Sequence, residues 1–340
     1  MRVAVITGPG RVSVEDRDDP VLPGPDGAVV KVDLTAICGS DLHFYDDDIP
    51  MFPVAAGHEV VGTVVETGSD VGTVSVGDRV LVASVAGCGR CDGCARRDPI
   101  QCVEGGKVFG AGELGGGQAE LLAVPAADFN LLAVPEGVDD EAALLLTDNL
   151  ATGWAGAQRG EVQPGDTVLV IGLGAVGLCA VRSALALGAE RVLVADPVEG
   201  RRQRAVASGG TALEGPTAEA VLEATGGRGA STVIDAVAKD VTLDDAFASV
   251  RAGGTISVIG VHDLDPYPLP VLMGLFRSIT LRMTTAPIHA TWPDLVPRIQ
   301  EGTLDTTGIF THQFALEDAA AAYAAVAART ADCVKVTLRP

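Results

Sequence analysis

The sequence predicts an α/β protein of two domains, in which a β-rich part precedes a parallel sheet covered by helices on both faces. Its 340 residues are long for one hydrophobic core and common for two. The pattern changes near residue 148: short valine-rich runs between Gly, Pro and Asp turns come before it, and alternating strands and helices come after it. Apolar strands that alternate with helices are typical of parallel sheets.

The β-rich part contains short strands joined by irregular loops. Its clearest strands are "GAVVKVDLTAI", "HEVVGTVVETG" and "GDRVLVA", which are rich in β-branched residues. Near the other end of the chain, "HATWPDLVPRIQEGTLDT" and "EDAAAAYAAVAART" predict helices, and "DCVKVTLRP" predicts a returning strand.

The alternating region begins with the strand "DTVLVIG" and the helix "AVGLCAVRSALALGA". After them come the strand "RVLVAD", the helix "GRRQRAVAS" and the strands "STVIDAV", "GGTISVIG" and "SITLRM". In the first turn, Gly172, Gly174 and Gly177 fill a GxGxxG frame. The first glycine permits the tight turn, the second admits a pyrophosphate, and the third lets helix and strand approach closely. The helix starts at Ala175 and Val176, where free N–H groups favour phosphate. A glycine-rich turn that only packs is the alternative.

Asp196 ends the next strand, about twenty residues further on, where an acid accepts hydrogen bonds from adenosine ribose hydroxyls. This position favours NAD over NADP, because a carboxylate repels the extra phosphate of NADP. Arg201 and Arg202 follow closely and could weaken the preference.

Four of the seven cysteines lie in the segment 86–104, at Cys88, Cys91, Cys94 and Cys102. Their spacing, CxxCxxCx7C, suits four thiolates around one tetrahedral zinc ion. Sulfur then fills every position and leaves none for water or substrate, so we expect this zinc to be structural. Disulfides are the alternative, and a reducing compartment disfavours them.

A second group of metal-ligating residue types is dispersed along the chain. The stretches "CGSDLHFYDDD" and "AAGHEVVG" contain Cys38, Ser40, Asp41, His43, His58 and Glu59. One thiolate and one imidazole on neighbouring loops can begin a zinc site that lacks a full set of protein ligands. Such a site keeps a position for substrate.

On these motifs the chain resembles the zinc-containing alcohol dehydrogenases of the medium-chain dehydrogenase/reductase family, over essentially its whole length. "CGSD", "GHE", the four-cysteine segment and "GLGAVG" occur in the order of the family. The resemblance implies a GroES-like catalytic domain at 1–148, completed by 288–340, and an inserted Rossmann NAD(P)-binding domain at 149–287. It also implies two zinc ions per chain and a homodimer or homotetramer.

By the same resemblance, Cys38, His58 and Asp148 bind a catalytic zinc, and Glu59 is an exchangeable fourth ligand. Family members with a Cys2His set have a second cysteine at the position of Asp148. A carboxylate is a harder ligand, so zinc stays plausible with different tuning. Asp148 could instead cap the helix that follows it. Asp41 matches the position that orients the ligand histidine.

The implied reaction is hydride transfer between NAD and a primary or secondary alcohol or a polyol. Zinc lowers the pKa of a bound alcohol, and the alkoxide that forms can release hydride to the nicotinamide. Ser40 and His43 match the relay that carries the alcohol proton to solvent, although His43 could be an ordinary loop residue. Lys335 resembles a residue that reaches the pyrophosphate, and a surface lysine is the alternative.

The composition narrows the partners. A net charge of −21 disfavours nucleic acid and anionic lipid. The first residues reach Gly and Pro too early for a signal peptide, and no apolar run is long enough to span a membrane. We therefore predict a cytoplasmic protein that acts on a small alcohol or carbonyl compound.

Three classes of function remain open on the sequence alone. They are the zinc-dependent alcohol dehydrogenase, which includes threonine- or formaldehyde-type activities, a zinc-free quinone or enoyl reductase, and a nucleotide-sensing protein with an idle site. The ligand set argues against the second, and the intact relay argues against the third. Five remaining residues lack partners at ligand spacing and are assigned to structure: Cys179, Cys333, His262, His289 and His312.

Overall fold

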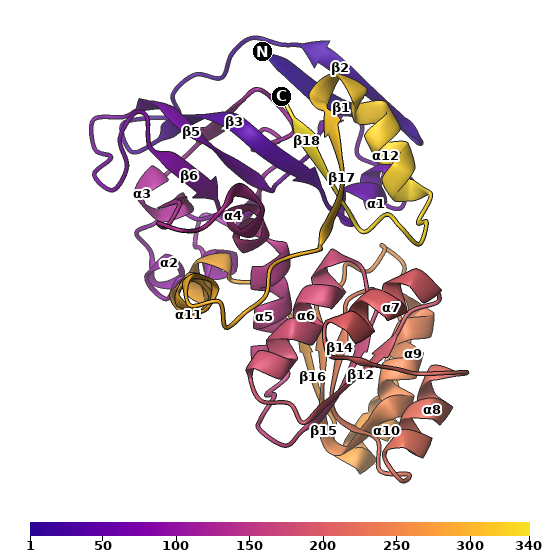
Figure 1. Cartoon of the computed structure of the whole chain (residues 1–340). Coiled ribbons are helices and arrows are strands. Elements are labelled where there is room, and N and C mark those ends of the chain that lie inside the picture. The colour runs from indigo at the N-terminus through magenta and orange to yellow at the C-terminus, as the bar shows by residue number, and fades with distance from the viewer. The chain divides into compact units, whose positions relative to one another are not determined.

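A computed structural model describes all 340 residues, which form two compact units (Figure 1). The first unit contains 1–151, 287–302 and 306–340, and the second contains 152–286 and 303–305. The sequence analysis expects the chain to enter the Rossmann domain after residue 148 and to leave it after residue 287. In the structure the second unit begins at 152 and its main part ends at 286, and it also includes 303–305. None of the helices combines the length and the apolar character that crossing a bilayer demands.

The first unit is built on a seven-stranded sheet with the order β10-β6-β5-β3-β18-β17, in which β9 also pairs with β3. Smaller sheets are β2-β1-β4 and β7-β8. The strands are β1 (Arg2–Gly8), β2 (Arg11–Asp16), β3 (Ala28–Ile37), β4 (Val54–Ala55), β5 (Val60–Thr67), β6 (Arg79–Val82), β7 (Val85–Ala86), β8 (Lys107–Val108), β9 (Leu121–Val124), β10 (Leu131–Ala133), β17 (Phe310–Ala315) and β18 (Lys335–Arg339).

Short helices fill the connections of the first unit. They are α1 (Asp41–Tyr45), α2 (Asp92–Ala95), α3 (Ala127–Asn130), α4 (Asp140–Thr147), the start of α5 (Asn149–Arg159), α11 (Ile288–Gln300) and α12 (Ala319–Ala327), with 3-10 turns at Pro99–Gln101 and Leu316–Asp318. The two helices and the returning strand that the sequence predicted near its end are α11, α12 and β18. The polar strand β17 was missed.

Strand register positions the polar residues of the first unit. In the antiparallel pair β3·β5, Thr35 lies opposite Val60, so the end of β3 meets the start of β5. In the antiparallel pair β18·β3, Val336 lies opposite Ile37. The residues just beyond these strand ends are therefore neighbours, although they come from distant parts of the sequence.

The second unit is a six-stranded parallel sheet with the order β13-β12-β11-β14-β15-β16. This is the doubly wound order of a Rossmann domain, with the reversal between β11 and β14. Its elements are β11 (Thr167–Ile171), α6 (Ala175–Ala186), β12 (Arg191–Ala195), α7 (Glu199–Ala207), β13 (Thr211–Ala212), α8 (Thr217–Ala224), β14 (Ala230–Asp235), α9 (Asp240–Ser249), β15 (Val250–Val258), α10 (Val271–Arg277) and β16 (Thr280–Met283). The predicted fold class, a GroES-like β-rich domain with a Rossmann domain, is confirmed.

Candidate active site

The strand register brings two metal-ligating side chains together. Cys38 follows the last residue of β3, and His58 stands two residues before β5. A third comes from a break between helices, because α4 ends at Thr147, α5 begins at Asn149, and Asp148 lies between them. Together with Glu59, these residues offer one ligand atom each, and all four atoms lie within 4.8 Å of one another.

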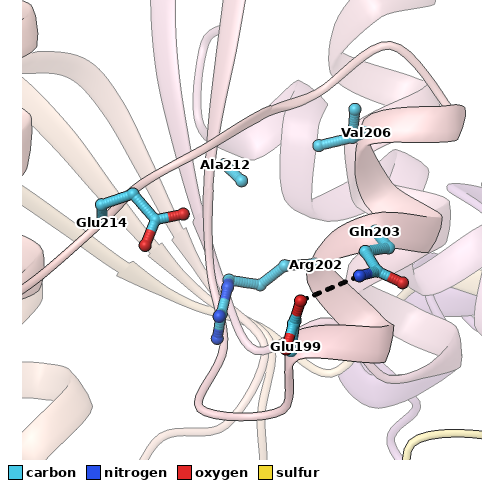
Figure 2. A pocket seen from close by; sticks show the side chains of 6 residues that line it. All are labelled: Glu199, Arg202, Gln203, Val206, Ala212 and Glu214. Atoms are coloured by element: carbon cyan, nitrogen blue, oxygen red, sulfur yellow. Dashed lines mark hydrogen bonds between the residues drawn. The ribbon is translucent and has the colours of Figure 1, made fainter.

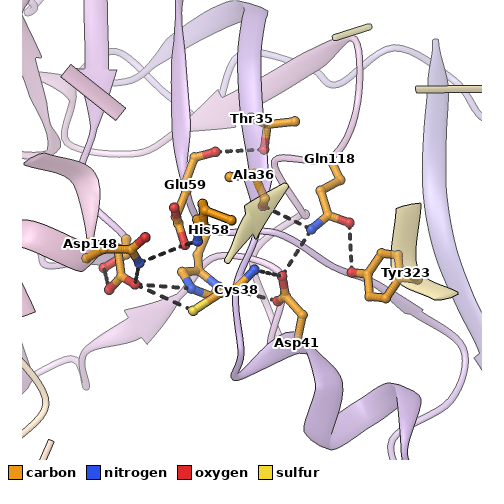
Figure 3. A network of polar contacts seen from close by, with 12 residues as sticks. Thr35, Ala36, Cys38, Asp41, His58, Glu59, Gln118, Asp148 and Tyr323 are labelled. Atoms are coloured by element: carbon orange, nitrogen blue, oxygen red, sulfur yellow. Dashed lines mark hydrogen bonds and ion pairs between the residues drawn. The ribbon is translucent and has the colours of Figure 1, made fainter. Parts of the chain in front are cut away.

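Two of the predicted ligands, Cys38 and His58, meet at one oxygen of the third, Asp148 (Figure 3). Asp148 Oδ2 lies 3.6 Å from Cys38 Sγ and 3.8 Å from His58 Nε2. Cys38 and His58 are 7 % and 8 % exposed, so water reaches the pair poorly. A thiolate, an imidazole and a carboxylate are donors that zinc accepts, and three of them leave one tetrahedral position for another ligand.

The protonation of these groups reflects burial and mutual charge. Burial, and then the Asp148 carboxylate, raises the pKa of the Cys38 thiol. Burial opposes the charged form of His58, but Cys38 and Asp41 outweigh it and raise the imidazole pKa well above its ordinary value. Protons therefore occupy the site in the absence of a cation, and a cation that binds there must displace them.

A chain of hydrogen bonds leads from Tyr323 to Asp41, which contacts Cys38 and His58 (Figure 3). Tyr323 of α12 donates to Gln118 Oε1 (2.8 Å), and Gln118 Nε2 donates to Asp41 Oδ2 (3.0 Å). The same carboxylate accepts from the Cys38 backbone N–H (3.0 Å), and its other oxygen lies 3.6 Å from His58 Nδ1. Asp41 thus faces the nitrogen of His58 that is turned away from Asp148.

Glu59 is fully buried and is held from two sides. Lys335 Nζ lies 2.5 Å from Glu59 Oε1, and Asn149 Nδ2 donates to the same oxygen at 3.1 Å. Glu59 Oε2 is buried without a hydrogen-bond partner. Burial raises the pKa of Glu59, against the opposing effect of the Lys335 ammonium. Lys335 is only 3 % exposed, so the alternative of a surface lysine is wrong.

The two proposed relay residues lie beside the same loop. Ser40 precedes α1, and His43 lies within that helix with a side chain that is 14 % exposed. His43 Nδ1 lies 3.1 Å from Asp48 Oδ2. A carboxylate only accepts hydrogen bonds, so this contact places a proton on Nδ1 and leaves Nε2 as an acceptor when the ring is neutral.

The cysteine segment forms a separate group. The sulfur atoms of Cys88, Cys91, Cys94 and Cys102 lie within 4.8 Å of one another. Backbone N–H groups of Cys94 and Val103 lower the pKa of Cys91 to about 6, so this thiol ionises easily. Four sulfurs at this separation suit one tetrahedral zinc. Asn130 fastens the segment, since it accepts from the Gly87 N–H and donates to the Gly87 carbonyl, both at 3.0 Å.

The glycine-rich turn of the second unit has the backbone that dinucleotide binding requires. Gly172 has φ +84°, a Cβ on Gly177 would collide with the Gly172 carbonyl oxygen, and a Cβ on Gly174 would meet nothing within 4 Å. Asp196 accepts from the Leu173 N–H and the Val198 N–H, both at 2.8 Å, which joins the end of β12 to the turn. Arg201 Nη1 lies 3.9 Å from Asp196 Oδ2.

Comparison with known proteins fits both units. Residues 24–136 match the alcohol dehydrogenase GroES-like domain, and residues 175–301 match the zinc-binding dehydrogenase domain. A probable zinc-binding alcohol dehydrogenase of Mycobacterium tuberculosis is 58 % identical over 100 % of this chain and 89 % of its own. The chain belongs to the zinc-type alcohol dehydrogenases of the medium-chain dehydrogenase/reductase family. It is an alcohol oxidoreductase.

Two solved structures of alcohol dehydrogenases superpose on the whole chain. An alcohol dehydrogenase from Thermus sp. ATN1 is 35 % identical, with a TM-score of 0.92 and coverage of 100 % of this chain and 99 % of its own. An Escherichia coli alcohol dehydrogenase complexed with NADH is 27 % identical, with a TM-score of 0.89 and coverage of 100 % and 99 %.

Within this zinc-type alcohol dehydrogenase, some residues of the site have no signal in the sequence. Gln118 contacts Asp41 and Asp48 contacts His43, whereas Tyr323 reaches the site only through Gln118. Their types and spacings suggest no metal chemistry. Asn149 was missed although it adjoins Asp148. Its position, directly after a proposed ligand, is the signal that could have found it.

Proposed function

We propose that Cys38, His58 and Asp148 hold the catalytic zinc of this dehydrogenase and that the reaction uses NAD. The observation that carries the proposal is the convergence of sulfur, nitrogen and oxygen ligand atoms from three distant parts of the chain within 4.8 Å. Zinc bound there would be a Lewis acid that lowers the pKa of an alcohol hydroxyl and polarises a carbonyl. We propose a second zinc, with a structural role, on the four cysteines.

The protein residues around the centre have separate tasks in this proposal. Asp41 keeps His58 in the orientation and tautomer that present Nε2 to the metal. Glu59, with Oε2 unpartnered, is the reserve ligand. Ser40 and His43 take up the proton of the alcohol, and the contact of His43 Nδ1 with Asp48 keeps Nε2 ready to accept it.

The second unit favours NAD over NADP on the following grounds. Near Asp196, a pocket is lined by Glu199, Arg202, Gln203, Val206, Ala212 and Glu214 (Figure 2). Two carboxylates there oppose the phosphate of NADP. The single guanidinium, that of Arg202, already donates to the backbone carbonyl of Asp196 at 2.7 Å. Contacts of Arg201 and Lys335 with the cofactor stay predictions.

A panel of alcohols and polyols, assayed with NAD and NADP by the absorbance of the reduced nicotinamide, tests the proposal. We expect turnover with NAD, at least tenfold lower kcat/KM with NADP, and two zinc ions per chain by elemental analysis. The panel includes threonine and formaldehyde-related substrates, which belong to the same reaction class. Equal use of both cofactors would refute the NAD preference, and turnover that survives removal of the zinc proposed on Cys38, His58 and Asp148 would refute the catalytic centre.

We also propose that the second unit associates with a second copy of the chain through α10 and β16. No residue of α10 is buried, and its side chains at Val271, Leu272, Leu275 and Phe276 are 68–81 % exposed. Residues 266–286 contain no acid in a chain of net charge −21, so this face lacks the repulsion that other faces have. β16 is an edge strand, which can pair with its own copy around a two-fold axis.

Sedimentation of Phe276→Glu tests this association. We expect a monomer from Phe276→Glu, and a dimer or tetramer from the wild type and from Val76→Glu, a control at an exposed apolar residue of the first unit. A wild-type monomer, or an oligomer that survives Phe276→Glu, would contradict the proposed face.

We also propose a reducing, cytoplasmic compartment, because cysteines that bind a metal as thiolates must stay reduced.

A further inference from the structure

Asn149 is the first residue of α5 and is fully buried beside the centre proposed to hold the catalytic zinc. Its amide nitrogen donates to two different carboxylates. Nδ2 lies 2.8 Å from Asp148 Oδ2 and 3.1 Å from Glu59 Oε1. An amide nitrogen carries two hydrogens, so both bonds can form at once.

The chemistry of the acceptors determines how the amide is turned. Ionised carboxylates only accept hydrogen bonds, so an amide turned the other way would place three acceptor oxygens together. The orientation with Nδ2 toward Asp148 and Glu59 leaves Asn149 Oδ1 buried without a partner. Asn149 therefore donates to both acids, while its own Oδ1 makes no hydrogen bond.

The two acids need such a donor because they are like charges in a poorly solvated site, where Glu59 is fully buried and the Asp148 side chain is 15 % exposed. Each contributes one oxygen to a group of atoms within 4.8 Å, where charges of one sign repel strongly. The Lys335 ammonium offsets the negative charge of Glu59, to which it donates a hydrogen bond. The amide of Asn149 is the contact that reaches both acids, and its acceptor on Asp148 is Oδ2, the oxygen that faces Cys38 and His58.

We propose that Asn149 is a positioning residue for the metal centre: it holds Asp148 Oδ2 in place as the third ligand and keeps Glu59 beside it. The proposal rests on the proposed ligand set of Cys38, His58 and Asp148. It concerns zinc affinity in the first place and turnover only through it. Asn149 itself touches neither substrate nor metal in this role.

Zinc affinity measured by competition with a chromophoric chelator tests the role. The protein is first dialysed until one zinc per chain remains, and the second site is then titrated. For Asn149→Leu, which keeps the volume and removes both donors, we expect about 10- to 100-fold weaker binding. For Asn149→Ser, which keeps one donor, we expect a smaller loss. With cobalt in place of zinc, the visible absorption bands of Asn149→Leu should shift, because an oxygen ligand has moved.

Two further variants make the result decisive. Asn130→Leu removes a second buried asparagine, which serves the cysteine segment, and should leave the affinity of the titrated site within twofold of wild type. Asp148→Ala tests the ligand set itself: wild-type affinity there would refute the ligand set, whatever Asn149 does. The proposal for Asn149 falls if Asn149→Leu binds zinc within twofold of wild type. It also falls if both Asn149 variants lower the unfolding temperature equally with and without zinc, because the residue then supports only α5.

Discussion

The first unit contains two groups of metal-ligating side chains that differ in how the chain assembles them. The cysteine group comes from the single segment between Cys88 and Cys102, whereas the other group joins Cys38, His58 and Asp148. The spacing of one motif is enough to predict the cysteine group. The other group forms only when β3 pairs with β5 and α4 ends just before Asp148. A local cage of four sulfurs leaves no open position, and a fold-assembled set of mixed ligands leaves one.

The substitution Cys38→Ser should produce the largest effect and tests the second group. Loss of a Lewis acid worth several kcal/mol corresponds to a decrease in kcat of about 1000-fold or more. Because the glycine-rich turn lies in the other unit, the Kd for NAD should change less than threefold. Zinc content should fall from two ions to one per chain. A well-folded Cys38→Ser enzyme with more than a tenth of wild-type activity would contradict the assignment.

The substitution Cys91→Ser should act on the fold instead of the chemistry. Loss of a structural zinc should cost about 3 kcal/mol, or roughly 6–12 °C in Tm. The remaining folded enzyme, assayed well below that temperature, should keep a kcat within about threefold of wild type. Calorimetry and steady-state kinetics on the same preparation measure both. Equal damage to folding from Cys38→Ser and Cys91→Ser would abolish the distinction between the two groups.

How far each group could be predicted follows from the same contrast. The four cysteines, the GHE motif and the glycine frame are read from spacing, because the residues that act together are close in sequence. Lys335 is different. Lysine is rarely buried, and its partner Glu59 lies 276 residues away, so only the pairing of β18 with β3 reveals the contact.

The supporting residues were unpredictable for related reasons. Gln118 and Tyr323 are ordinary residue types whose task depends on where α12 packs, and no period or motif encodes it. The strands β13 and β17 were missed because the first has two residues and the second is polar. By contrast, the long apolar strands of the second unit were predicted. Strands that are buried on both faces of a sheet have a continuous run of hydrophobic residues, which is visible in the sequence.

The substitution Asp41→Asn tests whether the fold-assembled group depends on its support. The amide side chain would keep the shape of the carboxylate but lose the charge that faces His58 Nδ1. We expect zinc at the catalytic centre to bind about 10- to 100-fold more weakly, with the zinc on the cysteines unaffected. Chelator competition followed by zinc counting separates the two ions. Loss of both zinc ions together would indicate a general loss of structure.

The smallest expected effect is a loss of stability at acidic pH, which we attribute to His289 near the cysteine segment. His289 of α11 is 2 % exposed, stacks on Phe129 and lies 3.3 Å from Asn130 Oδ1. Burial, and then the charge of Arg97, lowers the pKa of His289 to about 3. The folded protein therefore keeps this ring neutral, while the unfolded chain binds a proton below about pH 6.5. The stability that depends on the neutral ring is present above that pH and is lost as the pH falls toward 3.

Urea unfolding at pH 7.5 and 5.5, with zinc in excess, compares wild type with His289→Gln. Between these values the wild type should lose about 1 kcal/mol more than the variant, because glutamine takes up no proton. Since His289 contacts the segment that fastens the cysteines and not the catalytic ligands, kcat at pH 7.5 should be equal in the two proteins. An identical pH dependence would mean that the folded protein binds a proton at His289 as readily as the unfolded chain does. A change in kcat would mean that the two groups of ligands communicate through α11, whose Trp292 donates at 3.0 Å to the carbonyl of Leu146, two residues before Asp148.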